Sequence, residues 1–341
     1  PPPPPPPPHP PPTTDTYTNA ESSAASDVYK RQHGPLEAPM TSKKRIIICA
    51  DGTWNRPEKD ISLDFPTNVL KLARGIRPVA QDKVPQVVFY DWGIGSDGKK
   101  ISGGVLGKGL DKNIQDGYRF IVQNYRPGDE IYLFGFSRGA FTVRSLAGFM
   151  NNCGILKREH ANRIHEAFEF YRDRDSKTRP GLSRAQKFRD AYSGGKRGPV
   201  HFIGVWDTVG ALGVPIFLFN ARNRRKYAFH DTQIGSNVRV ARHALAINEY
   251  RNDFRPTLWD KKAGADIEQV WFAGSHSDVG GSQKPDAAGH LLSDVALGWV
   301  MDEASEVGLS VEGHLVTGLK PSGVATHHLS RKGMYLSLIH I

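Results

Sequence analysis

Short apolar runs alternate with amphipathic segments along most of this sequence, and this alternation constrains the fold more than any other feature. Five runs rich in Val, Ile and Phe are expected to be strands: Arg45–Ala50, Gln86–Asp91, Glu130–Phe136, Val200–Trp206 and Glu268–Ala273. Helices are expected between and after them, at residues 67–76, 109–125, 138–152, 159–172, 184–192, 237–248 and 291–305. Continuous apolar runs of this length are typical of parallel strands covered on both faces. The sequence therefore predicts an α/β fold with a mostly parallel central sheet and helices on both faces.

The two ends of the chain differ from this pattern. Residues 1–42 open on eight prolines and hold 13 of the 24 prolines of the chain, and such sequence buries too little apolar surface to fold. We expect a disordered leader at 1–42, one α/β domain at 43–333 and a tail at 334–341. Residues 22–32 and the tail resemble translated adaptor sequence, so the fold is predicted without either end.

The chain is basic, with 45 Lys and Arg against 35 Asp and Glu and a formal net charge of +10. A basic balance favours anionic partners without choosing among them. Nucleic acid is not expected as a partner, because no nucleic-acid-binding motif or interleaved aromatic stripe accompanies the charge. Cys49 and Cys153 make neither a disulfide framework nor a Cys-rich zinc site, and no metal or organic cofactor is expected.

A G-x-S-x-G motif, Gly135–Gly139 (GFSRG), lies between the third expected strand and the helix that follows it. A sharp strand-to-helix turn needs small residues on both sides of the serine and lifts its hydroxyl out of the sheet. Ligands of open α/β sheets bind at the carboxyl ends of the strands, which is where this turn places Ser137. The alternative is a plain tight turn whose serine only caps the helix.

A serine hydroxyl is a poor nucleophile unless a base removes its proton, and the base needs an orienting carboxylate. Asp207 follows the fourth apolar run, and His276 lies on a Gly/Ser-rich loop after the fifth. This chain order, Ser then Asp then His, is that of α/β-hydrolases. We predict Ser137, Asp207 and His276 as a catalytic triad. The alternatives are a turn or cap carboxylate at Asp207 and a histidine bonded to local backbone at His276.

Three further residues are retained as alternative or supporting site residues. His243 falls in the helix expected at 237–248, where a core or surface histidine is the more typical role. Asp278 follows His276 by two residues, close enough in sequence to orient it or to bind a metal. Asp51 follows the first strand, as the nucleophile of haloacid-dehalogenase-type phosphatases does, but position 53 is Thr where those enzymes have a second Asp.

An oxyanion needs two preorganised N–H donors. The backbone of Arg138, directly after the serine, is expected to supply one. The loop after the first strand is expected to supply the other, from Gly52 or Thr53, because Gly52 allows close backbone approach.

Two other segments have more than one interpretation. Residues 103–109 (GGVLGKG) lack the G-K-[ST] ending of a phosphate loop and are interpreted as a flexible loop. Residues 211–226 are apolar and then basic, which suits an interfacial lid on anionic lipid. A buried helix followed by a charged turn is the alternative for that segment.

Five blocks of sequence, in this order, resemble the uncharacterised α/β-hydrolase domain family related to type VI secretion phospholipase effectors. They are CADGTWN (49–55), GFSRGAFTVRSLAG (135–148), GVWDTVGALG (204–213), ARHALAINEYR (241–251) and GSHSDVGG (274–281). The resemblance spans residues 43 to 328 and implies a serine hydrolase of ester bonds, with phospholipids as the substrate of the best-understood members. It implies Ser137 as nucleophile, Asp207 as acid and His276 as base.

We therefore predict that residues 43–333 form the catalytic domain of a serine esterase or lipase that cleaves carboxylic esters of lipids or phospholipids through an acyl-enzyme. The expected partners are an ester or lipid substrate and, peripherally, an anionic membrane. With no apolar run of 18 residues and no signal peptide, the chain is expected to be cytoplasmic as synthesised, with any export independent of a signal peptide. The alternative is a non-catalytic binding or scaffold module on a hydrolase fold.

Overall fold

The computed structural model describes residues 43–52, 55, 57–58, 60, 63–93, 103–173, 178–209, 234–251, 254–260 and 264–329, without the side chains of 103–108. The expected leader, the tail at 334–341 and the lid segment at 211–226 lie outside these residues. The single domain at 43–333 accordingly remains a prediction.

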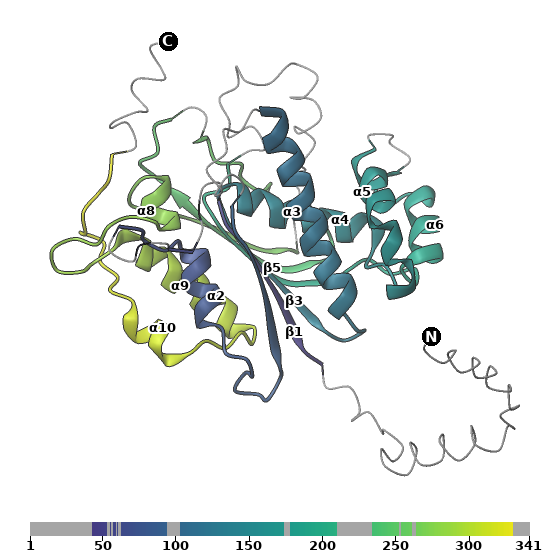
Figure 1. The fold of residues 1–341 in the computed structure, drawn as a ribbon, viewed down its shortest axis with the longest axis horizontal. Coiled ribbons are helices and arrows are strands. Elements are labelled where there is room, and N and C mark those ends of the chain that lie inside the picture. Colours follow the sequence, from purple (N-terminus) through teal and green to yellow (C-terminus); the bar gives the residue numbers. More distant parts are fainter. Residues whose placement is uncertain are drawn as a thin grey trace, which may run out of the picture. The chain divides into compact units, whose positions relative to one another are not determined.

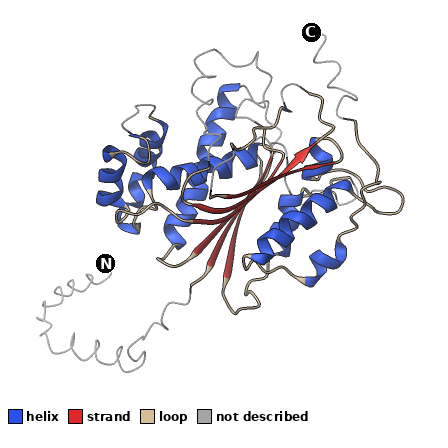
Figure 2. Ribbon diagram, turned by 180° about the vertical axis from the view of Figure 1, so that it is seen from behind, coloured by secondary structure: helices blue, strands red, loops and turns tan. Residues whose placement is uncertain are grey.

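A parallel β-sheet lies at the centre of the fold (Figure 2). Its strands among the described residues are β1 Arg45–Ala50, β2 Gln86–Asp91, β3 Glu130–Phe136, β4 Val200–Trp206, β5 Val238–Ala246 and β6 Asp266–Phe272. They are arranged in the order β2-β1-β3-β4-β5-β6, and every neighbouring pair is parallel. The prediction of an α/β fold with a mostly parallel sheet is confirmed.

Helices cover both faces of this sheet (Figure 1). The described helices are α2 Asn68–Gly75, α3 Gly103–Asn124, α4 Arg138–Cys153, α5 Ile164–Arg172, α6 Ser183–Tyr192, α8 His276–Gly280, α9 Leu292–Glu306 and α10 Gly313–Gly318, with a 3-10 turn, η1, at Arg158–Arg163. Helices α3 to α6 lie on one face, and α2, α9 and α10 lie on the other. None of the helices in the described ranges is long and apolar enough to cross a membrane.

The apolar core has two layers, one on each face of the sheet. Alternate residues of β1 enter different layers, because successive side chains of a strand point to opposite faces. Ile46 and Ile48 pack in the layer under α3 and α4, and Ile47 and Cys49 pack in the layer under α2 and α9. This double burial explains why the central strands read as continuous apolar runs.

The prediction of a helix at 237–248 is wrong, because residues 238–246 form the strand β5 between β4 and β6. The segment VRVARHALA is rich in residues that favour helices, yet Val240 to Ala246 are all buried in the sheet. Strand formation here depends on packing against two neighbouring strands, which outweighs the weak local preference.

Three further features differ from expectation. The edge strands β2 and β6 pack against both core layers but are less buried than the central strands, and Trp271 of β6 is half exposed. Residues 103–109 are not a flexible loop, since they form the start of α3. The short helices α8 and α10 were not expected, because five or six residues are too few to show a helical period.

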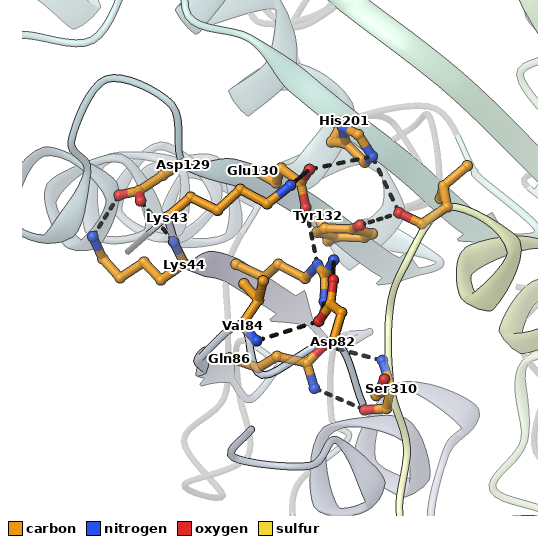
Figure 3. Close-up of polar contacts among 12 residues, drawn as sticks. Lys43, Lys44, Asp82, Val84, Gln86, Asp129, Glu130, Tyr132, His201 and Ser310 are labelled. Atoms are coloured by element: carbon orange, nitrogen blue, oxygen red, sulfur yellow. Dashed lines mark hydrogen bonds and ion pairs between the residues drawn. The ribbon is translucent and has the colours of Figure 1, made fainter. Parts of the chain in front are cut away.

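The amino end of the sheet is held together by ion pairs (Figure 3). The guanidinium of Arg45 donates to both carboxylate oxygens of Asp82, at 2.9 and 2.6 Å, and its Nε donates to Glu130 at 2.9 Å. Lys43 also donates to Glu130, at 2.7 Å. These contacts join the start of β1 to the start of β3, far along the strands from the edge where ligands of α/β sheets bind.

Candidate active site

The strand order places a crevice at the carboxyl ends of β1 and β3. From β1 the chain passes to β2 on one side and then crosses back to β3 on the other side of β1. The direction of winding therefore reverses between β1 and β3. Ligands of open α/β sheets bind at such a reversal, beyond the carboxyl ends of the strands. Asp51 and Gly52 follow β1 at this point, and Ser137 follows β3.

The turn at Ser137 is tight and strained. Ser137 has φ 57° and ψ −118°, a backbone conformation that costs free energy for a residue with a Cβ. A Cβ on Gly139 would lie 2.0 Å from the Ala50 carbonyl oxygen, and a Cβ on Gly135 would lie 2.5 Å from the Gly139 carbonyl oxygen. Both glycines of the motif are therefore required by the close approach of strand and helix. The serine side chain makes no capping hydrogen bond to α4, which disfavours the capping alternative.

Asp207 and His276 form a buried pair. The Oδ2 atom of Asp207 lies 2.6 Å from Nδ1 of His276, and its Oδ1 accepts the N–H of Ala246 at 3.1 Å. Asp207 is completely buried and His276 is 6% exposed. A carboxylate at Nδ1 holds the proton on that nitrogen and leaves Nε2 as a base.

The nucleophile turn and this pair are neighbours in the structure. The N–H of Ser137 donates to the carbonyl of Trp206, the residue before Asp207, at 3.1 Å. The ring of Phe136, the residue before Ser137, packs on the His276 imidazole with centroids 4.6 Å apart. The fold thus brings Ser137, Asp207 and His276 to the same edge of the sheet.

His276 is not on a loop as expected, because it is the first residue of the short helix α8. Its backbone N–H faces Glu249 Oε2 at 3.3 Å, and Phe254 packs edge-on against its ring with centroids 4.9 Å apart. The imidazole therefore contacts two aromatic rings, those of Phe136 and Phe254. The sequence shows no signal for Phe254, because its contact with His276 depends on the packing of the segment between β5 and β6.

Asp51 is buried beside the nucleophile turn and is fully engaged in hydrogen bonds. It accepts from the Thr67 hydroxyl at 2.6 Å, the Tyr90 hydroxyl at 2.8 Å and the Gly52 N–H at 2.7 Å. Burial raises the pKa of Asp51 above its ordinary value, and these donors oppose the rise. A carboxylate held in this way is poorly placed to act as a nucleophile. Sequence reasoning missed Thr67 and Tyr90; only the cap position of Thr67 before α2 is a local signal.

The expected oxyanion donors are only partly supported by this geometry. Gly52 lies against the nucleophile, since a Cβ added to it would be 3.2 Å from the Cβ of Ser137. Its N–H, however, already donates to Asp51. Thr53 lies outside the described residues. Arg138 is the first residue of α4, at the positive end of the helix dipole.

The other two supporting candidates have structural partners instead. Asp278 accepts from the N–H of Ser275 at 2.9 Å, which caps α8, and pairs with His328 Nδ1 at 2.6 Å. His243 is fully buried in β5 with partners near both ring nitrogens, which disfavours it as the base. Within the described ranges, no group of three or more His, Cys, Asp or Glu side chains is arranged to hold a metal ion.

Comparison with known proteins gives a family match. Residues 44–303 match the family model described as T6SS, Phospholipase effector Tle1-like, catalytic domain. The uncharacterized protein YEL023C of Saccharomyces cerevisiae is 28% identical over 236 residues, which cover 63% of this chain and 32% of the yeast protein. This chain thus spans about a third of that relative's length.

Two solved structures are similar at low sequence identity. An uncharacterized protein from Pseudomonas aeruginosa is 17% identical with a TM-score of 0.46, and the match covers 88% of this chain and 52% of that one. The Tle1 effector bound to the VgrG spike of the type 6 secretion system is 23% identical with a TM-score of 0.43, covering 71% of this chain and 52% of the effector. This chain therefore spans about half the length of each.

Proposed function

Because this chain belongs to the family of Tle1-like type VI secretion phospholipase effector catalytic domains, we propose that it is a serine hydrolase that cleaves carboxylic esters of phospholipids. The observation that carries the proposal is the buried 2.6 Å pair of Asp207 and His276 beside the strained turn at Ser137. A plain structural turn does not require this combination. The domain responsible would be residues 43–333.

The proposed reaction has two steps. Ser137 Oγ attacks the ester carbonyl while His276 Nε2 takes the hydroxyl proton, and Asp207 stabilises the resulting imidazolium. The C–O bond of the ester then breaks, His276 returns the proton to the leaving alcohol, and the acyl group stays on Ser137. Water, activated by His276, hydrolyses this acyl-serine and releases the carboxylic acid.

The negative charge that develops on the carbonyl oxygen needs N–H donors. We propose the Arg138 N–H as one donor, supported by its position at the start of α4. The second would come from the loop at Gly52 and Thr53. Since the Gly52 N–H donates to Asp51, Thr53 is the better candidate of the two.

Two further parts of the proposal, contact with a membrane and export, do not depend on the geometry of the site. A lipid substrate and the net charge of +10 support peripheral contact with an anionic membrane. Membership in a family of type VI secretion effectors supports export by that route. Both are part of this proposal.

Replacing Ser137 with Ala tests the proposal. We expect hydrolysis of a short p-nitrophenyl ester and of phospholipid vesicles to fall to background, since removal of a triad nucleophile costs about 10⁶-fold in kcat. Ser145→Ala is a matched control: this buried serine lies within α4, where its hydroxyl donates to the Phe141 carbonyl at 2.8 Å, so turnover should persist.

A fluorophosphonate probe separates the enzyme from a non-catalytic scaffold. The wild-type chain should be labelled, with the modified peptide containing Ser137, and Ser137→Ala should not be labelled. Undiminished ester hydrolysis by Ser137→Ala would show that the mechanism is wrong. Absence of labelling together with absence of turnover in the wild type would favour the scaffold.

A further inference from the structure

His243 lies fully buried in β5, directly beside the turn that carries Asp207. In the register of the sheet, His243 pairs with Val205 of β4, two residues before Asp207. Its Nε2 lies 3.1 Å from the backbone nitrogen of Thr208, the residue after Asp207. The other ring nitrogen, Nδ1, lies 3.3 Å from Gln269 Oε1 on β6. The imidazole therefore connects the acid turn to the edge of the sheet.

The hydrogen-bond partners determine which ring nitrogen carries the proton. A backbone N–H can only donate, so Nε2 must accept from Thr208 and carry no proton. The backbone of Trp259 sets the orientation of the Gln269 amide. The Trp259 N–H donates to Gln269 Oε1 at 2.8 Å, and the Trp259 carbonyl accepts from Gln269 Nε2 at 3.0 Å. Gln269 therefore presents an acceptor to His243, and Nδ1 carries the proton.

The surroundings of His243 keep the imidazole neutral. Burial, and then the positive charge of Arg144 on α4, lower the pKa of His243 to about 3. The Trp259 ring packs edge-on against it, with centroids 5.3 Å apart. A protonated imidazole would turn the Nε2 acceptor into a donor facing the Thr208 N–H, so the contact requires the neutral form.

The acid turn needs support because it is strained. Asp207 has φ 38°, a left-handed conformation that persists only when its surroundings hold it. Two contacts with the backbone of β5 do so: the Asp207 N–H donates to the Ala244 carbonyl at 2.7 Å, and Asp207 Oδ1 accepts from the Ala246 N–H at 3.1 Å. The Thr208 carbonyl accepts from the Thr257 N–H at 2.9 Å. In addition to these contacts, the Thr208 N–H donates to the side chain of His243 in β5.

We propose that His243 is a positioning residue for the triad acid: its Nε2 holds the Thr208 N–H and so keeps the Asp207 carboxylate aligned with His276 Nδ1. It touches neither substrate nor the reacting atoms. The inference rests on the proposed function, because it assigns His243 a role only through Asp207 and His276. It differs from the sequence-based alternative, in which His243 would itself be the base.

Two amide substitutions divide the roles of the two ring nitrogens. In His243→Asn the amide reaches the place of Nδ1 and keeps the Gln269 contact, but nothing accepts the Thr208 N–H. In His243→Gln the longer amide reaches the place of Nε2 and restores that acceptor. Both leave space where the ring was, so a purely structural role of the imidazole would affect them similarly.

The measurement is kcat and KM for a short p-nitrophenyl ester, with the pH profile of kcat, at a temperature where circular dichroism shows each variant folded. We expect kcat of His243→Asn to fall about 10-fold to 100-fold with little change in KM, the loss that follows small misplacement of a catalytic group. His243→Gln should recover most of it. His201→Asn, at the amino end of the neighbouring strand β4, is the matched control and should keep wild-type kcat.

Equal kcat losses in the two variants, or a wild-type kcat and pH profile in His243→Asn, would overturn the proposal. If neither variant folds, ¹⁵N NMR of the histidine-labelled wild type decides. It should show His243 neutral with Nδ1 protonated at pH 7, and a protonated Nε2 would overturn the proposal. Full activity of Ser137→Ala is a different result, which contradicts the proposed function rather than this role of His243.

Discussion

Both ends of the sheet place a histidine near a carboxylate, and the two pairs are built differently. At the carboxyl end, Asp207 and His276 are buried and meet at 2.6 Å. At the amino end, His201 Nε2 lies 4.0 Å from Glu130 Oε1 (Figure 3). There Glu130 also accepts from Lys43 and Arg45. The Asp207 carboxylate pairs with one imidazole, whereas the charge of Glu130 is neutralised mainly by Lys43 and Arg45.

The backbone conformation of these residues also differs between the two ends of the sheet. Ser137 and Asp207 themselves have positive φ, whereas Glu130 and His201 lie within regular strands. The pKa of Glu130 is raised by burial but lowered more by its bonds to Lys43 and Arg45, so that it lies below its usual value. The same side-chain types thus cross-link strands at one end, and under the proposed mechanism they orient the catalytic base at the other. Backbone strain at Ser137 and Asp207 supports placing the proposed site at the carboxyl end.

The largest expected difference between the ends comes from removing each carboxylate charge. Asp207→Asn keeps the size of the side chain and tolerates the positive φ, but it no longer fixes the tautomer of His276. We expect kcat for a short ester to fall about 10⁴-fold, as for other serine triads. Glu130→Gln, the control at the amino end, should leave kcat unchanged. Similar kcat values for the two variants would remove the functional distinction between the ends.

A smaller effect is expected on stability when the amino-end network is broken. Arg45→Met removes the donor shared by Asp82 and Glu130, and should lower the free energy of unfolding in urea by about 2 kcal/mol. This value is below that of a fully buried pair, because Asp82 is half exposed to solvent.

Lys112→Met is the matched control, because its i,i+4 pair with Asp116 is exposed and Asp116 keeps its pair with Arg119, so the loss should be only about 0.5 kcal/mol. The kcat of folded Arg45→Met should equal that of the wild type. A loss of kcat in this variant would mean that the amino end also supports catalysis.

A pH dependence of stability, spread over several pH units, is the effect expected from His243. Its pKa is about 3 in the folded chain against 6.5 when unfolded, so the unfolded state binds the proton first as the pH falls. The contribution is fully present above pH 6.5 and is lost toward pH 3, with a slope of at most about 1.4 kcal/mol per pH unit.

Urea unfolding at several pH values from 7 to 4 measures this slope. The His243→Gln variant should show a flatter dependence than the wild type. The pKa of His201 is lowered by burial as well, but this imidazole is only partly buried, so His201→Gln should flatten the dependence less. Equal slopes in the wild type and His243→Gln would show that His243 is not held neutral by the fold.

Local sequence determined the scaffold of the site. The strands β1 to β4 begin and end where their apolar runs do, because double burial demands continuous apolar residues. The turn at Ser137 was also predictable, because its G-x-S-x-G motif lies between an apolar run and an amphipathic segment. Both features are visible in a short window of sequence, whereas the close approach of Gly139 to Ala50 of β1 is not.

Tertiary structure alone decided how the groups meet. The segment of β5 has helix-favouring residues and becomes a strand only because β4 and β6 flank it. The chain order suggested Asp207 and His276 as partners, but their contact spans 69 residues and depends on where α8 begins. The capture of the Gly52 N–H by Asp51, and the position of His243 beside Thr208, depend on contacts between separate elements. Such distances are properties of packing, and no local pattern encodes them.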